Sequence, residues 1–260
     1  IGMRILGVEN LESTAWIFLK MALTGMGNPY AQYVMIDEVQ DYTADQLAVL
    51  ARYFRRANFM LLGDKNQAIK PNTASFDEIR EVFTRLRGSI EECRLMTSYR
   101  SSPEITSLFA SLLTREEQLH ISSIQREQIA PVFLECINEE GQLAALASEI
   151  KKAREEEGLT AVIVPWKSQA KKLEALLGKD APLMISSGST LPEQGVVLIT
   201  LGLAKGLEFD HVIIPDASEA TFPCEDVSRN RLYTTISRAT KRITLISKGA
   251  ITPLLHTEQE

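Results

Sequence analysis

The sequence has few of the residues that build disulfide frameworks or zinc sites. Its 260 residues include three histidines and three cysteines, and Cys93, Cys136 and Cys224 stand far apart. Disulfide frameworks need cysteines in pairs, and structural zinc sites need ligands at short, fixed spacings. The sequence therefore excludes both kinds of site, and we expect a protein of the reducing cytoplasm.

Long apolar runs and an excess of basic residues are also missing. No run approaches the roughly 20 apolar residues that a membrane span needs, so we expect no membrane partner. The 28 Lys and Arg are outnumbered by 34 Asp and Glu, which gives a net charge of −6. This balance excludes a dedicated basic nucleic-acid-binding module but leaves room for a local basic groove.

Short apolar runs alternate along the chain with amphipathic segments, and 45% of the residues are hydrophobic. This alternation is typical of βαβ units and predicts an α/β fold with largely parallel sheets flanked by helices. We expect the chain to divide near Met96, into residues 1–95 and 96–260.

The expected elements follow from the same patterns. The strands are expected at 33–37, 58–62, 94–96, 132–137, 161–164, 196–200, 211–215 and 243–246. Helices are expected after the N-cap Thr43 and at 76–86, 103–113, 141–157, 168–177 and 229–238, with a loop over 114–130.

The most informative stretch runs from Val34 to Asp41, where three apolar residues lead into two adjacent acids. Such a strand delivers acids to the edge of a sheet, where a nucleoside triphosphate and Mg²⁺ can bind. Asp37 suits Mg²⁺, because this ion takes one or two protein carboxylates besides water and phosphate oxygens. Glu38 is placed to orient or deprotonate an attacking water. Taken alone, the pair is explained equally well as an ordinary polar strand end.

Gly63 and Asp64 directly follow the second expected strand, and Gln67 comes three residues later. Parallel α/β sheets bind their ligands at this carboxyl end of the strands. A neutral amide such as Gln67 can accept a hydrogen bond from water and donate one to a phosphate oxygen. An ordinary turn after a strand is the alternative.

Two arginines in the second half are candidate phosphate ligands. Tyr99 can stack on a base, and Arg100 can bind a phosphate through its planar guanidinium, although packing is the favoured interpretation of this pair alone. Arg238 lies in the segment Tyr233–Ala239, which is expected on a helix. A single helical arginine is usually a solvated surface residue.

The segment from Thr200 to Asp210 is more specific. Its Lys205 and Gly206 resemble part of a phosphate-binding loop, although the second glycine and the Ser or Thr of such a loop are missing. Glu208 suits a hydrogen bond with a ribose hydroxyl.

The order of these segments is more informative than any one of them. The chain reads, in succession, Asp-Glu-x-Gln-Asp, Gly-Asp-x-x-Gln, Tyr-Arg-Ser, Ala-Lys-Gly-Leu-Glu-Phe-Asp and Tyr-x-x-x-Ser-Arg-Ala. This succession, from Val34 to Ile246, resembles motifs II to VI of superfamily 1 DNA helicases of the UvrD/Rep type. The resemblance implies two RecA-like domains: the end of the first in residues 1–95, and a complete second in 96–260.

In that family the two domains clamp ATP and Mg²⁺ between them and move along single-stranded DNA. The resemblance therefore implies ATP and Mg²⁺ as cofactors and nucleic acid as the partner. Carried over by motif, the roles are a Mg²⁺ ligand (Asp37), a catalytic base (Glu38), a γ-phosphate sensor (Gln67), an adenine-stacking residue (Tyr99), two γ-phosphate ligands (Arg100 and Arg238), a nucleotide-binding pair (Lys205 and Gly206) and a ribose ligand (Glu208).

The sequence departs from the family pattern in its phosphate loop. No Gly-x-x-x-x-Gly-Lys-Ser/Thr occurs, and in this family that loop precedes the acid motif. Because the chain begins at Ile1, we expect the C-terminal piece of a longer helicase, completed by an N-terminal remainder and alone a weak ATPase. Residues 68–72 also lack the aromatic that stacks on a DNA base in this family. We therefore expect weaker binding of single-stranded DNA than in a processive unwinding helicase.

Two further departures concern the second half of the chain. Gly202 stands where a histidine is common, and the stretch between Arg100 and Lys205 is too short for the large helical insertion of UvrD and Rep. Together with the two departures above, they favour a resemblance to the HelD, or helicase IV, branch. The alternative function is therefore a HelD-type ATPase that binds RNA polymerase and releases it from nucleic acid without unwinding.

Overall fold

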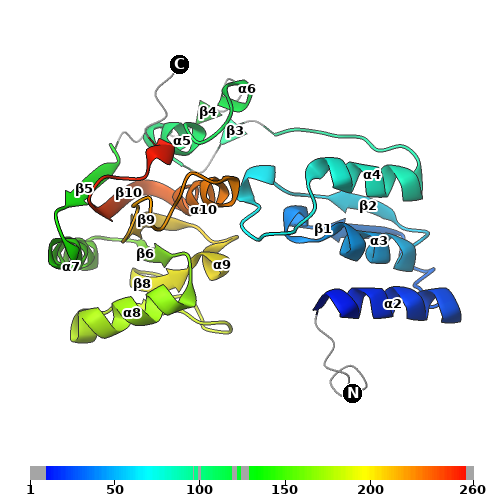
Figure 1. Ribbon diagram of the computed structural model, residues 1–260, viewed down its shortest axis with the longest axis horizontal. Helices are drawn as coiled ribbons and strands as arrows, with labels where there is room; N and C mark the ends of the chain where they lie inside the picture. Colours follow the sequence, from blue (N-terminus) through cyan, green and yellow to red (C-terminus); the bar gives the residue numbers. More distant parts are fainter. Residues whose placement is uncertain (1–9, 96, 99–100, 119–121, 124–128, 256–260) are drawn as a thin grey trace. The chain divides into compact units, whose positions relative to one another are not determined.

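The computed structural model describes residues 10–95, 97–98, 101–118, 122–123 and 129–255. The chain divides into two compact units, Ile1–Arg94 and Leu95–Glu260 (Figure 1). Each unit contains parallel strands flanked by helices, so the predicted α/β class is confirmed. None of the helices in the described part of the chain combines the length and apolarity that crossing a membrane requires.

The first unit is built on two parallel strands, with Tyr33 opposite Asn58 and Ile36 opposite Leu61. Leu47 of the following helix is completely buried and packs in one core with Ile36. The elements are α2 (Asn10–Thr24), β1 (Tyr33–Ile36), the 3-10 turn η1 (Val39–Asp41), α3 (Ala44–Tyr53), β2 (Asn58–Leu61), the 3-10 turn η2 (Lys65–Gln67) and α4 (Phe76–Arg87).

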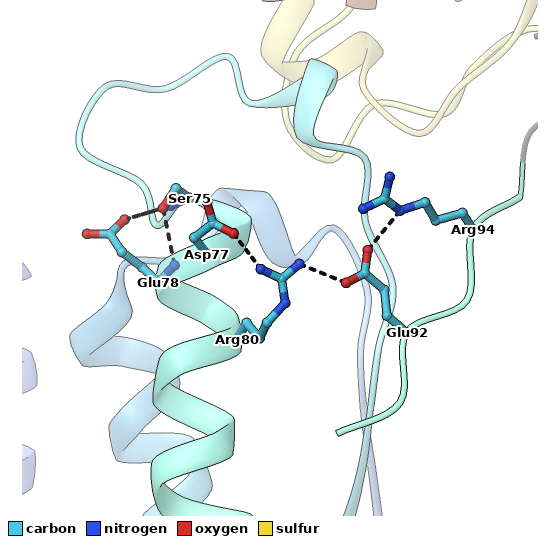
Figure 2. Close-up of polar contacts among 6 residues, drawn as sticks. All are labelled: Ser75, Asp77, Glu78, Arg80, Glu92 and Arg94. Atoms are coloured by element: carbon cyan, nitrogen blue, oxygen red, sulfur yellow. Dashed lines mark hydrogen bonds and ion pairs between the residues drawn. The ribbon is translucent and has the colours of Figure 1, made fainter. Parts of the chain in front are cut away.

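Both helices that follow a strand in this unit begin at a capping box. The Thr43 side chain accepts from the Gln46 N–H, and the Gln46 side chain accepts in return from the Thr43 N–H. Ser75 and Glu78 make the same reciprocal pair at α4 (Figure 2). Each box satisfies N–H groups that the first turn of a helix leaves without partners. The N-cap predicted at Thr43 is confirmed.

An ion-pair network ties the end of the first unit to α4 (Figure 2). Arg80 pairs with Asp77 one turn earlier and with Glu92, at 2.7 Å. Glu92 also accepts from Arg94 at 2.9 Å, and the hydrogen bonds from Arg80 and Arg94 lower its pKa. The network holds the chain that leaves this unit against the first turns of α4.

The second unit contains a six-stranded sheet in which every neighbouring pair is parallel, in the order β5-β10-β9-β6-β8-β7. Its strands are β5 (Val132–Cys136), β6 (Leu159–Val164), β7 (Leu183–Met184), β8 (Gly195–Thr200), β9 (Phe209–Ile214) and β10 (Ala239–Lys248). Its helices are α5 (Pro103–Ala110), α6 (Arg115–Gln118), α7 (Glu139–Glu155), α8 (Lys167–Leu177), α9 (Leu201–Ala204) and α10 (Asp226–Ile236), with the 3-10 turns η3 (Gly178–Asp180) and η4 (Pro253–Leu255).

Both faces of this sheet are covered. Successive strand residues point to opposite faces, and one set packs against Leu146 and Ile150 of α7 and Ala170 of α8. The strand residues between them are buried as well, and α5, α9 and α10 contact the sheet. All six residues of β6 are buried, as expected for a central strand of a parallel sheet.

The structure differs from the sequence-based expectation at several places. Arg94 and Leu95 are not in a strand; instead β3 (Thr97–Ser98) pairs with β4 (Ser122–Ser123), which a local pattern could not reveal. The expected loop 114–130 contains α6 and β4. The last helix ends at Ile236 rather than 238, because β10 begins at Ala239, which pairs with Phe209.

Candidate nucleotide site

The two acids follow β1 directly, at the carboxyl end of the strand. Asp37 is exposed and accepts a hydrogen bond from the Glu38 N–H at 2.8 Å. Glu38 is half-buried and has left-handed backbone angles, φ 52 and ψ 44. This conformation is uncommon for a residue with a side chain, and strained backbone of this kind clusters at functional sites. It turns the chain sharply after the strand.

Gln40 connects these acids to the second strand. Its side chain is completely buried: Nε2 donates to the Glu38 carboxylate, and Oε1 accepts from the Asp64 N–H at 3.1 Å. Asp64 follows β2, so one amide side chain joins the ends of both strands. Because both of its ends are engaged inside the protein, Gln40 fixes where the Glu38 carboxylate lies.

Asp64 extends this connection to Gln67. Its Oδ2 atom accepts from Gln67 Nε2 at 3.0 Å, and its Oδ1 atom accepts from the Asn66 N–H at 2.9 Å. We call the connected residues Glu38, Gln40, Asp64 and Gln67 the acid–amide chain. The structure thus brings together two sequence-predicted site residues, Glu38 and Gln67, through two that were not singled out.

Gly63 makes room for the acid–amide chain. A Cβ atom on this residue would overlap Gln40 Oε1 and lie 2.8 Å from Cγ1 of Val39. Real Cβ atoms do not approach other atoms so closely. The glycine of the Gly-Asp-x-x-Gln segment is therefore explained by the buried amide beside it.

The donor set at β1 fits Mg²⁺ better than a transition metal. Within the described residues no group of three or more His, Cys, Asp or Glu side chains is arranged to hold a metal ion. Mg²⁺ needs only one or two protein carboxylates, because waters and phosphate oxygens complete its octahedral shell. The exposed carboxylate of Asp37 meets that requirement.

In the second unit, three distant segments converge. Ser101 Oγ donates to the Ala239 carbonyl at 2.8 Å, and the Ser102 N–H donates to the Thr240 carbonyl at 3.0 Å. The Phe209 N–H donates to the Arg238 carbonyl at 2.9 Å. Tyr99 and Arg100 lie outside the described residues, but the buried Ser101 fixes the chain that follows them.

Arg238 is not the solvated surface residue that its pattern alone would suggest. It is 4% exposed and follows the C-cap of α10 rather than lying on the helix. Its guanidinium donates to the carbonyls of Thr234 at 3.2 Å and Leu207 at 3.3 Å, and to Ser237 Oγ at 3.2 Å. The bond to Leu207 joins this arginine to the Lys205–Glu208 loop.

That loop connects α9 to β9. Gly206 has φ 81, a left-handed conformation that favours glycine, and nothing lies within 4 Å of a Cβ built there. Lys205 is half-buried and Glu208 is exposed. The structure therefore brings Lys205, Gly206 and Glu208 together with Arg238 in one region of the second unit.

Two residues of the same motifs are structural. Asp210 accepts from the Leu159 N–H at 2.9 Å, a bond that lowers the pKa of this carboxyl, and it pairs with Lys241 at 3.0 Å. It therefore joins β9 to the start of β6. The Tyr233 ring is buried edge-on against Phe109, with centroids 5.3 Å apart.

Sequence reasoning missed the roles of Gln40 and Asp64. Both stand inside the quoted segments, Asp-Glu-x-Gln-Asp and Gly-Asp-x-x-Gln, so the signal was present. Only the pairing of β1 with β2 reveals that one amide spans from Glu38 to Asp64.

Comparison with known proteins gives a family match over part of the chain and a set of similar solved structures. Residues 195–246 match the family profile of the UvrD-like helicase C-terminal domain. The chain is similar to the crystal structure of the C-terminal domain of a possible DNA helicase from Lactobacillus plantarum WCFS1, with 28% identity and a TM-score of 0.50. That match covers 61% of this chain and 92% of the other. No curated protein sequence matches the chain.

A second set of similar structures supports the fold alone. Dbp5 of S. cerevisiae, bound to RNA and ADP BeF3, gives a TM-score of 0.55 at 14% identity, and a variant of it gives 0.54 at 13%. Each match covers 90% of this chain and 57% of the yeast chain. The parallel sheets flanked by helices are thus similar in fold to those of Dbp5, and residues 195–246 are similar to the UvrD-like helicase C-terminal domain.

Proposed function

We propose that the chain is the C-terminal motor region of an ATP-dependent superfamily 1 DNA helicase or translocase. The single observation that carries the proposal is the acid–amide chain, which joins a candidate base to a candidate phosphate sensor. Residues 1–95 are proposed to be the end of a first motor domain and residues 96–260 a second. The phosphate loop would come from an N-terminal remainder.

In the first unit, Asp37 would hold Mg²⁺, which when bound neutralises phosphate charge. Glu38 would orient the attacking water and accept its proton. Gln40 would hold the Glu38 carboxylate in place through the bond to its own buried amide. A fixed base is effective because a small displacement of a catalytic group costs much of its contribution to the rate.

Gln67 would report the state of the γ-phosphate to the rest of the unit. Its amide donates to Asp64, whose backbone N–H donates to Gln40. A shift of Gln67 would therefore reach Glu38 through Asp64 and Gln40. This supports a coupling between phosphate contact and the position of the base.

The second unit would supply the positive charge. Arg238 and Arg100 are proposed to contact the γ-phosphate, Tyr99 to stack on adenine, Glu208 to bind the ribose, and Lys205 and Gly206 to line the nucleotide. Arg238 is supported by its bond to Leu207, which places it beside the Lys205–Glu208 loop. Tyr99 and Arg100 rest on the sequence motif alone. Arginines in such positions contribute roughly 10³ to 10⁵ to phosphoryl-transfer rates.

The second candidate function is a HelD-type ATPase that remodels or releases RNA polymerase without unwinding. The stretch between Arg100 and Lys205 favours it, because this stretch is too short for the large helical insertion of UvrD and Rep. Single-stranded DNA remains the partner in the leading proposal, and RNA polymerase in this one.

Activity of the full-length parent protein separates the two candidates. Strand displacement and ATP turnover would be measured with and without RNA polymerase. Unwinding of a duplex without polymerase supports the helicase and rules out the second candidate. The 260-residue chain alone should hydrolyse ATP weakly, and robust turnover by it would contradict the proposed need for an added phosphate loop.

A further inference from the structure

The second unit presents an exposed tryptophan at the carboxyl edge of its sheet. Trp166 stands two residues after β6 and is 42% exposed, whereas Phe209, Phe222 and Tyr233 of the same unit are buried; Phe133 is the other exposed aromatic side chain among the unit's described residues. Leaving an indole in water forgoes a favourable burial that is among the largest any side chain offers. Its position calls for an explanation beyond packing.

Trp166 lies where the direction of the chain connections changes. Strands β6 and β9 are neighbours in the sheet. After β6 the chain runs through α8 to β7, at one edge of the sheet. After β9 it runs through α10 to β10, which lies toward the opposite edge. In open parallel sheets, ligands bind in the crevice outside the carboxyl ends of such a pair. A cavity of about 480 Å³ opens at this edge, lined by Pro165 after β6 and by Pro215 and Asp216 after β9; Trp166 follows Pro165 but does not line the cavity itself.

The surroundings of Trp166 are basic. The guanidinium of Arg231, on α10, lies over its ring at 5.3 Å from the centroid. Trp166 is also the N-cap of α8, whose first turn carries no acid, and Lys167 and Lys171 are exposed on one face of that helix. A helix N-terminus with lysines beside it favours anions. The indole is therefore flanked by groups that attract a phosphate backbone.

We propose that Trp166, held by Arg231, is a stacking platform for one base of a single-stranded nucleic acid. The inference rests on the proposed function and adds to it a base-binding residue. Aromatic stacking accepts every base, because each has a π-face, and basic residues beside the platform hold the backbone. Such a platform would compensate for the aromatic residue missing from positions 68–72.

Intrinsic fluorescence provides a direct test, because the chain has only two tryptophans, Trp16 and Trp166. In a Trp16→Phe background, all tryptophan emission comes from Trp166. The 260-residue chain would be titrated with a 12-nucleotide oligo-dT and with an abasic oligonucleotide of the same length and charge. We expect oligo-dT to quench the emission and the abasic strand to bind more weakly and quench little.

Substitutions separate stacking from charge. Trp166→Ala should weaken oligo-dT binding, followed by anisotropy of a labelled strand, about 5- to 150-fold, which corresponds to about 1–3 kcal/mol. Trp166→Phe should restore most of the affinity, and Arg231→Ala should weaken it about two- to thirty-fold. The matched control is Trp16→Phe, which should bind like the original chain. Thermal melting would show that each variant is folded.

Three results would each refute Trp166 as a stacking platform: equal affinity for both oligonucleotides, unchanged Trp166 emission, or full affinity for oligo-dT in Trp166→Ala. If DNA still binds in that case, the proposed motor function stands without it. If neither oligonucleotide binds, the platform is refuted, and ATP turnover and strand displacement by the parent protein decide the motor function separately.

Discussion

Gly63 and Gln40 lie in direct contact, and each explains the other. The buried Gln40 amide occupies the space that a side chain at residue 63 would need. In return, the turn at Gly63 brings the Asp64 N–H to Gln40 Oε1, at 3.1 Å. Two sequence segments that look separate, one after each strand, are therefore parts of one hydrogen-bonded arrangement.

The first prediction concerns Gly63. Gly63→Ala should displace the Gln40 amide, move the Glu38 carboxylate and lower ATP turnover of the parent protein at least tenfold. It should also lower the melting temperature, because overpacking costs about 1–3 kcal/mol. Gly202→Ala is the stability control, since nothing lies within 4 Å of a Cβ built there. Normal turnover in Gly63→Ala would show that the Gln40 contact has no functional role.

The second prediction concerns the candidate base. In the full-length parent protein, Glu38→Gln should abolish hydrolysis while nucleotide binding is retained, because an amide cannot accept the proton from water. Turnover by a coupled assay and affinity for a fluorescent ATP analogue would be measured side by side. Asp45→Asn, an exposed acid in the first turn of α3, is the control. Unchanged turnover would rule out Glu38 as the base.

The third prediction concerns Arg238. Arg238→Ala should lower turnover of the parent protein by orders of magnitude, as the loss of a γ-phosphate arginine does. It should also destabilise the second unit, because it removes the bonds to Thr234 and Leu207. Arg238→Lys keeps the charge without the planar fork and tests catalysis in a more stable background. The exposed Arg229→Ala should change neither. A small effect of both Arg238 variants on turnover would exclude a phosphate contact.

The fourth prediction concerns Asp210. The Leu159 N–H lowers the pKa of this carboxyl below its unfolded value, so its contribution to stability is present above the unfolded pKa and is lost as pH falls through the folded one. Asp210→Asn should cost about 1 kcal/mol at pH 7, limited by the partial exposure of the side chain. Denaturant unfolding at pH 7 and pH 3 measures this. Asp226→Asn, which removes a carboxylate from a surface ion pair, is the control. If Asp210→Asn lowers the unfolding free energy equally at both pH values, the Asp210 carboxylate charge does not contribute to stability.

The fifth prediction concerns His211, which is 8% exposed and hydrogen-bonded to Thr244 at 3.0 Å. Burial lowers the pKa of His211. The negative charges of Glu156 and Glu149 act against this shift, and the positive charge of Arg242 adds to it. Below pH about 6.5 the unfolded chain therefore binds a proton that the folded chain does not, and stability falls.

Unfolding free energies from pH 7.5 to 5.5 test this dependence. His211→Gln should reduce the change of the unfolding free energy with pH over this range, because glutamine does not titrate. An unaltered slope in the variant would assign the acid sensitivity to other groups.

Much of the architecture could be predicted from local patterns. The apolar run before Asp37, the N-cap Thr43 and the Ser102-Pro103 start of α5 all lie where expected, since these signals act within a few residues. The end of α10 could not be predicted, because it is set by pairing of Ala239 with Phe209, 30 positions away in the chain. The β3–β4 pair was missed for the same reason.

The candidate site divides along the same line. The sequence by itself determined the chemical groups and their order: two acids after one strand, an amide after the next, and an arginine near the last helix. Only the tertiary structure decided that Gln40 is buried between Glu38 and Asp64, and that Arg238 is buried against Leu207. Those contacts depend on which strands pair and in which register, and pairing is fixed by the packing of the whole sheet rather than by neighbouring residues.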